Sequence, residues 1–169
     1  MSSTRKKYTT SYKKKVDVER DTYLPRLSPA GIIQCSGCGA FYYRRRWTLK
    51  RPTRVPSSVH FNRTFCPACR KINEKYPSGE LHLLGLEAAD RRAVVSNLRN
   101  EEGRAREKNP LERIMNLEAS NGHWKVETTT EKLAQRLGRS LRKARGGNVQ
   151  YKWSHNNKFV RVTWHKGED

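Results

Sequence analysis

Four cysteines form two pairs with the same internal spacing, and this pattern constrains the fold more than any other feature of the chain. Cys35 and Cys38 are two residues apart, as are Cys66 and Cys69, and 27 residues separate the pairs. Two thiolates at this spacing can face one ion from a tight turn, and a second such turn completes a tetrahedral shell of sulfur ligands. The sequence therefore predicts one structural Zn²⁺ ion held by all four cysteines.

Other uses of the four cysteines fit the sequence less well. Two disulfides would need an oxidising compartment, whereas the chain shows no apolar segment of the kind that follows the basic start of a secretion signal. A thioredoxin-type redox site needs one cysteine pair on a larger scaffold of strands and helices. His60 is an alternative ligand, although four cysteines already saturate the site. Four sulfur ligands leave no open position for water or substrate, so we expect a structural ion. The missing secretion signal predicts a cytoplasmic protein.

The charge of the chain is strongly positive and unevenly distributed. Among 169 residues, 36 are Lys or Arg and 16 are Asp or Glu, which gives a formal net charge of +20. No acidic residue occurs between Asp21 and Glu74. Internal ion pairs cannot neutralise such a segment, whereas a polyanion that releases its condensed counterions can. Nucleic acid is the predicted partner class, with an anionic membrane as the weaker alternative.

Composition divides the chain into three segments. Residues 1–27 carry 8 basic and 3 acidic side chains without strand or helix periodicity, which predicts a basic arm that is disordered when free. Residues 28–78 are rich in Cys, Gly, Pro, Arg and aromatic residues, which is typical of loops and short hairpins. They have too few apolar side chains to fold alone, so a four-Cys zinc-binding domain that unfolds on loss of one cysteine is predicted.

Residues 79–169 are predicted to form a small α/β domain. Periodicity predicts a helix from Ala88 to Lys108, and the pair Asn109-Pro110 is expected to break it and start a short helix through Leu117. Thr130 and Glu131 belong to a predicted helix cap, after which Leu133, Leu137, Leu141 and Ala144 form an apolar stripe that ends at Gly146-Gly147. Strands are expected at residues 80–86, 123–129, 149–153 and 159–164.

The predicted fold class is therefore α+β. It combines the basic N-terminal arm, a four-Cys zinc ribbon and a two-layer domain of order β-α-β-α-β-β with helices on one face of the sheet.

Between the cysteine pairs, cations alternate with aromatic rings, a composition typical of surfaces that bind phosphates and stack on exposed bases. A solvated basic loop is the alternative, and we assign Phe41 and Trp47 to packing against the cysteine turns. Exposed cations of a predicted helix, which are more often simply solvated, form a second candidate surface. The predicted RNA contacts are Lys6, Lys7, Lys13, Lys14, Lys15, Tyr42, Tyr43, Arg44, Arg45, Arg46, Lys50, Arg51, Arg54, Arg63, Arg70, Lys71, Arg139, Arg142 and Lys143.

Catalysis has little support in the sequence. A glycine-rich phosphate loop, a nucleophile grouped with His and an acid, and the His-x-Glu motif of zinc deaminases are all missing. We therefore expect a protein that is not an enzyme and has no small-molecule substrate.

The segment Ile33-Gln34-Cys35-Ser36-Gly37-Cys38-Gly39-Ala40-Phe41-Tyr42, followed by Trp47 and by Phe65-Cys66-Pro67-Ala68-Cys69-Arg70, resembles a known family. It is similar to the second cysteine knuckle of the archaeal and eukaryotic large-subunit export adaptor, whose family is named for nonsense-mediated mRNA decay. Later segments at 130–134, 149–152 and 159–162 match its helix followed by a hairpin, so the resemblance covers about residues 30–165.

The resemblance implies a ribosome-associated protein whose zinc region and adjoining α/β domain dock on the intersubunit side of the large subunit. Longer members have more cysteine sets and export signals, so nuclear export is not carried over. The leading hypothesis is a zinc protein that binds ribosomal RNA and ribosomal proteins in assembly, quality control or hibernation of ribosomes. A zinc-ribbon DNA-binding or transcription regulator is the alternative, and an RNA-processing enzyme is the third class.

Overall fold

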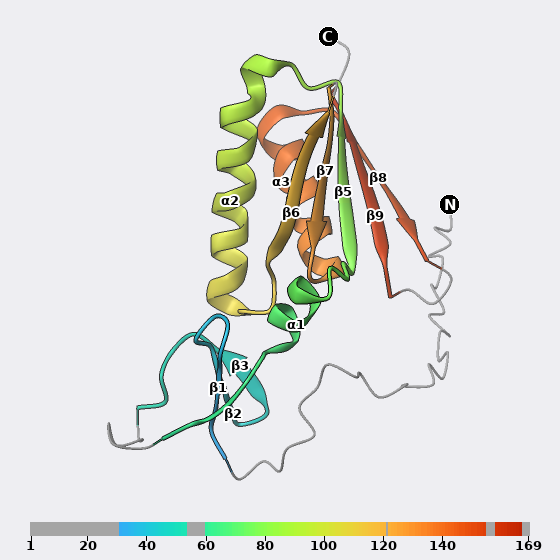
Figure 1. Cartoon of the computed structure of the whole chain (residues 1–169). Helices are drawn as coiled ribbons and strands as arrows, with labels where there is room; N and C mark the ends of the chain where they lie inside the picture. Colours follow the sequence, from blue (N-terminus) through green and yellow to red (C-terminus); the bar gives the residue numbers. More distant parts are fainter. Residues whose placement is uncertain (1–30, 54–59, 121, 155–157, 167–169) are drawn as a thin grey trace, which may run out of the picture.

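The computed structural model describes residues 31–53, 60–120, 122–154 and 158–166, which form two β-sheets with accompanying helices (Figure 1). The predicted α+β class is confirmed. The predicted arm at residues 1–27 lies outside the described residues. We call the segment from β1 to α1 the cysteine unit and the segment from β5 to β9 the large unit. No helix in the described ranges is long and apolar enough to cross a membrane.

The cysteine unit is a four-stranded sheet of very short strands in the order β3-β2-β1-β4. Strands β1 (Ile33–Cys35), β2 (Phe41–Tyr43) and β3 (Arg46–Thr48) are antiparallel, and β4 (Asn62–Thr64) lies parallel to β1. Helix α1 (Pro67–Asn73) follows β4. It was not predicted from the sequence, because seven residues are too few to show a helical period.

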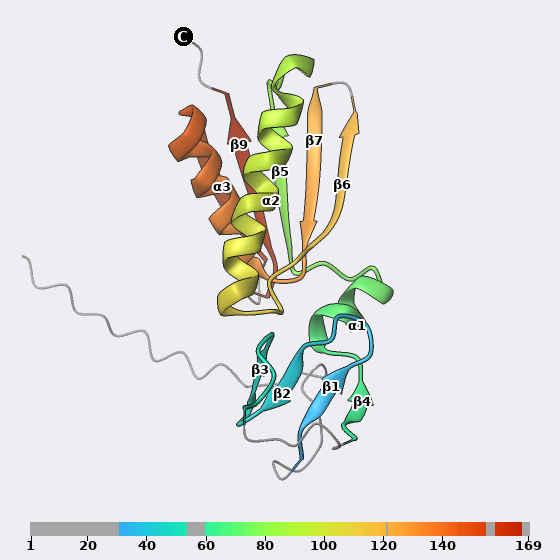
Figure 2. The same cartoon turned by 90° about the vertical axis from the view of Figure 1, so that its left-hand side faces the viewer.

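The large unit contains a five-stranded sheet in the order β6-β7-β5-β9-β8, with both long helices on one face (Figures 1 and 2). Strand β5 is central, antiparallel to β7 and parallel to β9. The elements in chain order are β5 (Gly79–Leu84), the short 3₁₀ turn Ala88–Asp90, α2 (Arg91–Lys108), β6 (Ile114–Ser120), β7 (His123–Thr128), α3 (Glu131–Arg145), β8 (Asn148–Trp153) and β9 (Val160–His165).

Helix α3 has the boundaries that its cap residues predict. The Thr130 side chain accepts a hydrogen bond from the Leu133 N–H at 3.2 Å, and Gly146 ends the helix with φ 70°. Its buried face consists of Leu133, Ala134, Leu137, Gly138 and Leu141, whereas Ala144, predicted on this stripe, is exposed. The stripe follows the helical period closely, and it packs against the apolar residues of β5 and β9.

The short helix predicted from Pro110 through Leu117 is wrong, because this segment enters the sheet as β6. Leu117 pairs with Val126 of β7, and the register shifts by a bulge between Ile114 and Asn116. The bulge breaks the alternation that would identify a strand in the sequence. Pairing with β7 therefore overrides the local pattern, and the observed order is β-α-β-β-α-β-β.

Candidate metal centre

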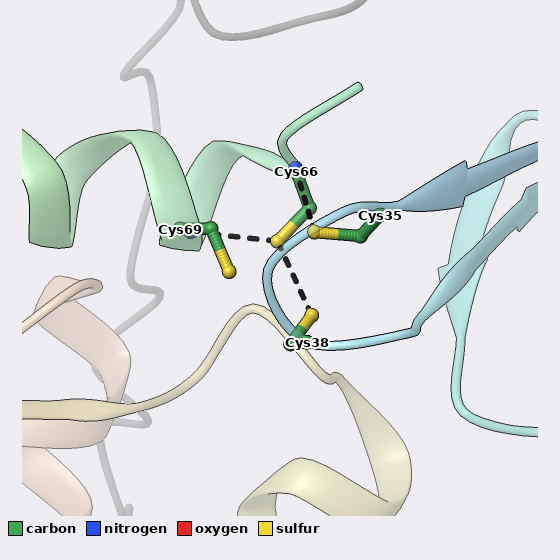
Figure 3. A group of neighbouring side chains, drawn as sticks. All are labelled: Cys35, Cys38, Cys66 and Cys69. Carbon is green, nitrogen blue, oxygen red and sulfur yellow. Dashed lines mark hydrogen bonds between the residues drawn. The ribbon is translucent and has the colours of Figure 1, made fainter. Parts of the chain in front are cut away.

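The turn between β1 and β2 and the start of α1 bring the four cysteine sulfurs together (Figure 3). All four Sγ atoms lie within 4.8 Å of one another, so the group can hold a metal ion. The Sγ atoms of Cys38 and Cys66 are 3.7 Å apart. A tetrahedral ion with metal–sulfur bonds of about 2.3 Å requires sulfur–sulfur distances of about 3.8 Å. The donor set thus has the size and chemistry of a four-thiolate site.

The first cysteine turn is closed by backbone hydrogen bonds. Cys35 N–H donates to the Ala40 carbonyl at 2.7 Å, and Gly39 N–H donates to the Cys35 carbonyl at 3.0 Å. Gly39 adopts φ 74°, a left-handed conformation that glycine adopts without strain. Gly37 has a different reason to be glycine, since a Cβ there would lie 2.9 Å from the Cys69 Sγ. The turn can therefore approach α1 closely enough for both cysteine pairs to share one ion.

Backbone and side-chain N–H groups donate hydrogen bonds to the sulfurs. The backbone N–H of Cys66 reaches the Cys35 Sγ at 3.1 Å, and that of Cys69 reaches the Cys66 Sγ at 3.4 Å. A side-chain donor is the Arg113 guanidinium, whose Nη1 lies 3.2 Å from the Cys69 Sγ. Such donors stabilise the negative charge of thiolates. Arg113 is not predicted from the sequence, because it lies 44 residues after Cys69 and belongs to no motif.

The close packing of the four sulfurs shifts the pKa values of the individual thiols in different directions. A hydrogen bond from Cys66 lowers the pKa of Cys38 to about 5, and the same contact raises the pKa of Cys66. Burial raises the pKa of Cys69 to about 11. Four neighbouring thiols therefore resist full ionisation on their own, whereas a divalent cation bound to all four sulfurs offsets half of the thiolate charge and releases the remaining protons.

A small apolar core surrounds the sulfurs. Trp47 is buried in it with Ile33, Ala40 and Ala68, and Leu111 of the large unit packs against it. Phe41 is also buried and packs edge-to-face on Phe61, with ring centroids 5.3 Å apart. Both rings assigned to packing are thus inside the protein.

The cations predicted to bind RNA differ in their surroundings. Arg44, Arg45, Arg46, Lys50, Arg51 and Arg63 are exposed on the cysteine unit, and Arg70, Tyr42 and Tyr43 are half-buried there. Arg139, Arg142 and Lys143 are exposed near the end of α3, away from the cysteine unit (Figure 1). Lys6, Lys7, Lys13, Lys14, Lys15 and Arg54 lie outside the described residues.

Several of these side chains already have partners within the protein. Tyr42 packs against Trp47, with ring centroids 5.3 Å apart. Lys71 Nζ donates to the Ser78 Oγ at 2.7 Å and to the Thr129 carbonyl at 3.1 Å, which connects α1 to the large unit. On α3, two further cations of the basic face pair with acids, Arg136 with Glu101 and Arg145 with Asp90.

The sheet face opposite the helices carries a second polar cluster around the buried carboxylate of Glu80. This carboxylate lies 3.0 Å from Lys125 Nζ and 3.1 Å from both His82 Nε2 and Arg161 Nε. Burial by itself would raise the pKa of Glu80, but the hydrogen bonds from these three neighbours outweigh burial and lower the pKa below its usual value. The cluster thus links three adjacent strands, β5, β7 and β9.

Comparisons of the chain with models of known protein families, with curated proteins and with solved structures give no significant match. The resemblance of the cysteine pairs to the export adaptor family therefore stays a prediction.

Proposed function

We propose that the chain is a non-enzymatic zinc protein that binds ribosomal RNA within ribosomal particles. The identity of the metal follows from its ligands. Four thiolates suit the soft or borderline ions, and zinc forms closed tetrahedral sites with four cysteines that have a purely structural role. The 3.7 Å separation of the Cys38 and Cys66 sulfurs supports this assignment.

One observation carries the RNA part of the proposal: the cysteine unit exposes Arg44, Arg45 and Arg46, which form no ion pair with any carboxylate of the described residues. Residues 31–73 contain no acidic side chain. In the large unit, by contrast, many cations pair with acids. Cations that form no ion pair within the protein are available to phosphates, and a polyanion is their natural counterion.

The ribosome is proposed as the source of that RNA because of the resemblance described above. It suggests the intersubunit side of the large subunit, with a role in assembly, quality control or hibernation. Ribosomal proteins would then be neighbouring partners in the cytoplasm.

The metal is tested by elemental analysis of the purified full chain. We expect one zinc per chain and its loss in the variant Cys66→Ser. A stoichiometric metal other than zinc, or wild-type protein that is folded without any metal, would contradict the assignment.

The RNA partner is tested by sedimentation of the tagged full chain in lysate through sucrose gradients at about 0.1 M and about 0.3 M salt, because phosphate contacts weaken steeply with salt. We expect co-migration with the large subunit at both concentrations, and loss of co-migration on reversing Arg44, Arg45 and Arg46 to Glu. Release of the wild type at the higher salt would contradict a specific ribosomal site. A preference for duplex DNA of one sequence over ribosomal RNA would favour a DNA-binding regulator instead.

A further inference from the structure

The hairpin between β2 and β3 has an unusual loop. Tyr43 and Arg46 are paired across the two strands, so the loop consists of Arg44 and Arg45 alone. Their φ angles are 50° and 63°. Two successive residues with positive φ at a two-residue hairpin loop define a type I′ turn, which matches the twist of the strands and is formed mostly by Asn and Gly.

Arginine is a poor choice for this conformation. A side chain with a Cβ is strained at positive φ, and such residues persist where function retains them. Across the described ranges, three residues other than glycine have positive φ, and two of them are these adjacent arginines. The sequence Asn-Gly would form the same turn with less strain, so the turn itself does not explain the two arginines.

Side chains of the two strands form packing contacts next to this loop. On one face, Tyr42 and Trp47 pack together above the cysteine core. On the other face, the Arg44 guanidinium lies over the Tyr43 ring, 5.3 Å from its centroid. Stacking on a ring leaves the planar N–H groups of a guanidinium free to donate at its edges. The Arg44 guanidinium is thus positioned at the tip of the hairpin by its contact with Tyr43.

We propose that the Arg44-Arg45 tip is a preorganised phosphate clamp for folded RNA, and that its strained conformation is retained for this contact at the expense of stability. The inference rests on the proposed function, and it specifies which part of the RNA is recognised. Arg44 and Arg45 are adjacent in the chain and form no ion pair among the described residues, so their guanidinium groups suit phosphates of one RNA backbone. The tip would therefore contribute affinity and orientation rather than sequence specificity.

The decisive variant is Arg44→Asn with Arg45→Gly, which supplies the preferred residues for the same turn. We expect the midpoint of thermal unfolding of the zinc-loaded full chain to rise by about 2–4 °C. The probe is a fluorescein-labelled RNA hairpin of about 30 nucleotides with an internal bulge, titrated at several KCl concentrations. We expect binding to weaken about tenfold or more. The slope of log K against log salt should fall by about 1.4–1.8, as for two lost phosphate contacts.

Two control variants test whether the effects come from the Arg44-Arg45 tip or from net charge alone. Arg44→Lys with Arg45→Lys keeps both charges and positive φ at non-glycine residues, so the salt slope should be retained and stabilisation should be absent. Arg92→Gln with Lys108→Gln removes two exposed charges from α2 instead. This variant should bind the probe nearly as well as the wild type.

The outcomes distinguish the clamp from the proposed function. If the wild type does not bind the RNA probe in low salt, both fail. If the wild type binds and the Asn-Gly variant keeps its affinity and salt slope, the clamp is overturned while RNA binding stands. A loss of affinity as large in the α2 control, or a lower midpoint in the Asn-Gly variant, also overturns the clamp.

Discussion

At the scale of single residues, the metal centre depends on a position that carries no ligand. Gly37 lies between the first two cysteines, and a Cβ there would lie 2.9 Å from the Cys69 Sγ and 3.3 Å from a ring carbon of Phe65. Real Cβ atoms do not approach sulfur and backbone-anchored groups this closely, so the two cysteine turns would have to separate. The absence of a side chain at Gly37 therefore allows the four sulfurs to converge.

Gly37→Ala is therefore expected to weaken metal binding about 10–100-fold, the range for changes beside the ligands. Competition with a chromophoric chelator measures this directly on the full chain. Gly103→Ala is a matched control, because nothing lies within 4 Å of a Cβ at that position of α2. The control should be neutral or stabilise the fold by about 0.5–1 kcal/mol. Equal chelator competition by both variants would show that the close approach does not matter.

At the scale of elements, the Glu80 carboxylate stabilises the pairing of three strands. Its pKa is lowered in the folded chain, so its contribution is fully present above the unfolded pKa and is lost as pH falls through the lower folded value. Glu80→Gln should destabilise the fold by about 1–3 kcal/mol at pH 7. The charged and titratable groups that face this carboxylate or its partners are His82, His123, Lys125, Glu127 and Arg161.

Urea unfolding followed by tryptophan fluorescence at pH 7 and pH 4 tests this sign. The difference between wild type and Glu80→Gln should shrink at the lower pH, because the stability that comes from a lowered pKa is lost as pH falls. Glu118→Gln is the control, since Glu118 is exposed on the edge strand β6 and bonds to Asn116. It should change stability little at either pH. A Glu80→Gln penalty of equal size at both pH values would mean that the carboxylate charge is not what stabilises the strands.

The elements differ in how far their sequences predict them. Helix α3 and strand β7 were predicted because each has a clear period and, for α3, a recognisable cap. Strand β6 was predicted as helix because Asn109-Pro110 suits a helix start, and its bulge between Ile114 and Asn116 interrupts the period of two that would have shown a strand. Helix α1 was not predicted because it is short and because its N-cap residue is Cys66. In the sequence, Cys66 indicates a metal ligand and gives no sign of a helix start. Local sequence patterns thus fail to show strand pairing that depends on the tertiary fold, and they fail to show a residue that has two structural roles.

At the scale of the whole molecule, contacts of Arg113, Lys71 and Leu111 join the metal centre to the large unit. Arg113 donates to the Cys69 sulfur, Lys71 donates to Ser78 and Thr129, and Leu111 packs against the cysteine core. The spacing of the cysteines correctly predicted that the four side chains converge on one place that can hold a metal ion. It could not predict Arg113, because the fold alone brings the segment before β6 beside α1. The metal centre is therefore completed by a unit that contributes no ligand.

This arrangement makes metal affinity depend on the large unit. A zinc ion with four thiolates carries a net charge of −2, and the Arg113 guanidinium compensates part of it at 3.2 Å from one sulfur. Arg113→Met keeps much of the side-chain volume and removes the charge and the donor, so metal affinity should fall about tenfold. Chelator competition on the full chain measures it.

Lys71→Met is the matched comparison, because Lys71 bridges the same two units through Ser78 and Thr129. It should lower the free energy of unfolding by about 1–3 kcal/mol while chelator competition changes much less than in Arg113→Met. If both variants lost metal affinity equally, general loosening of the junction would be the cause. If neither lost it, the cysteine unit would hold its metal independently. A selective loss in Arg113→Met would show that charge from the large unit acts on the thiolates themselves.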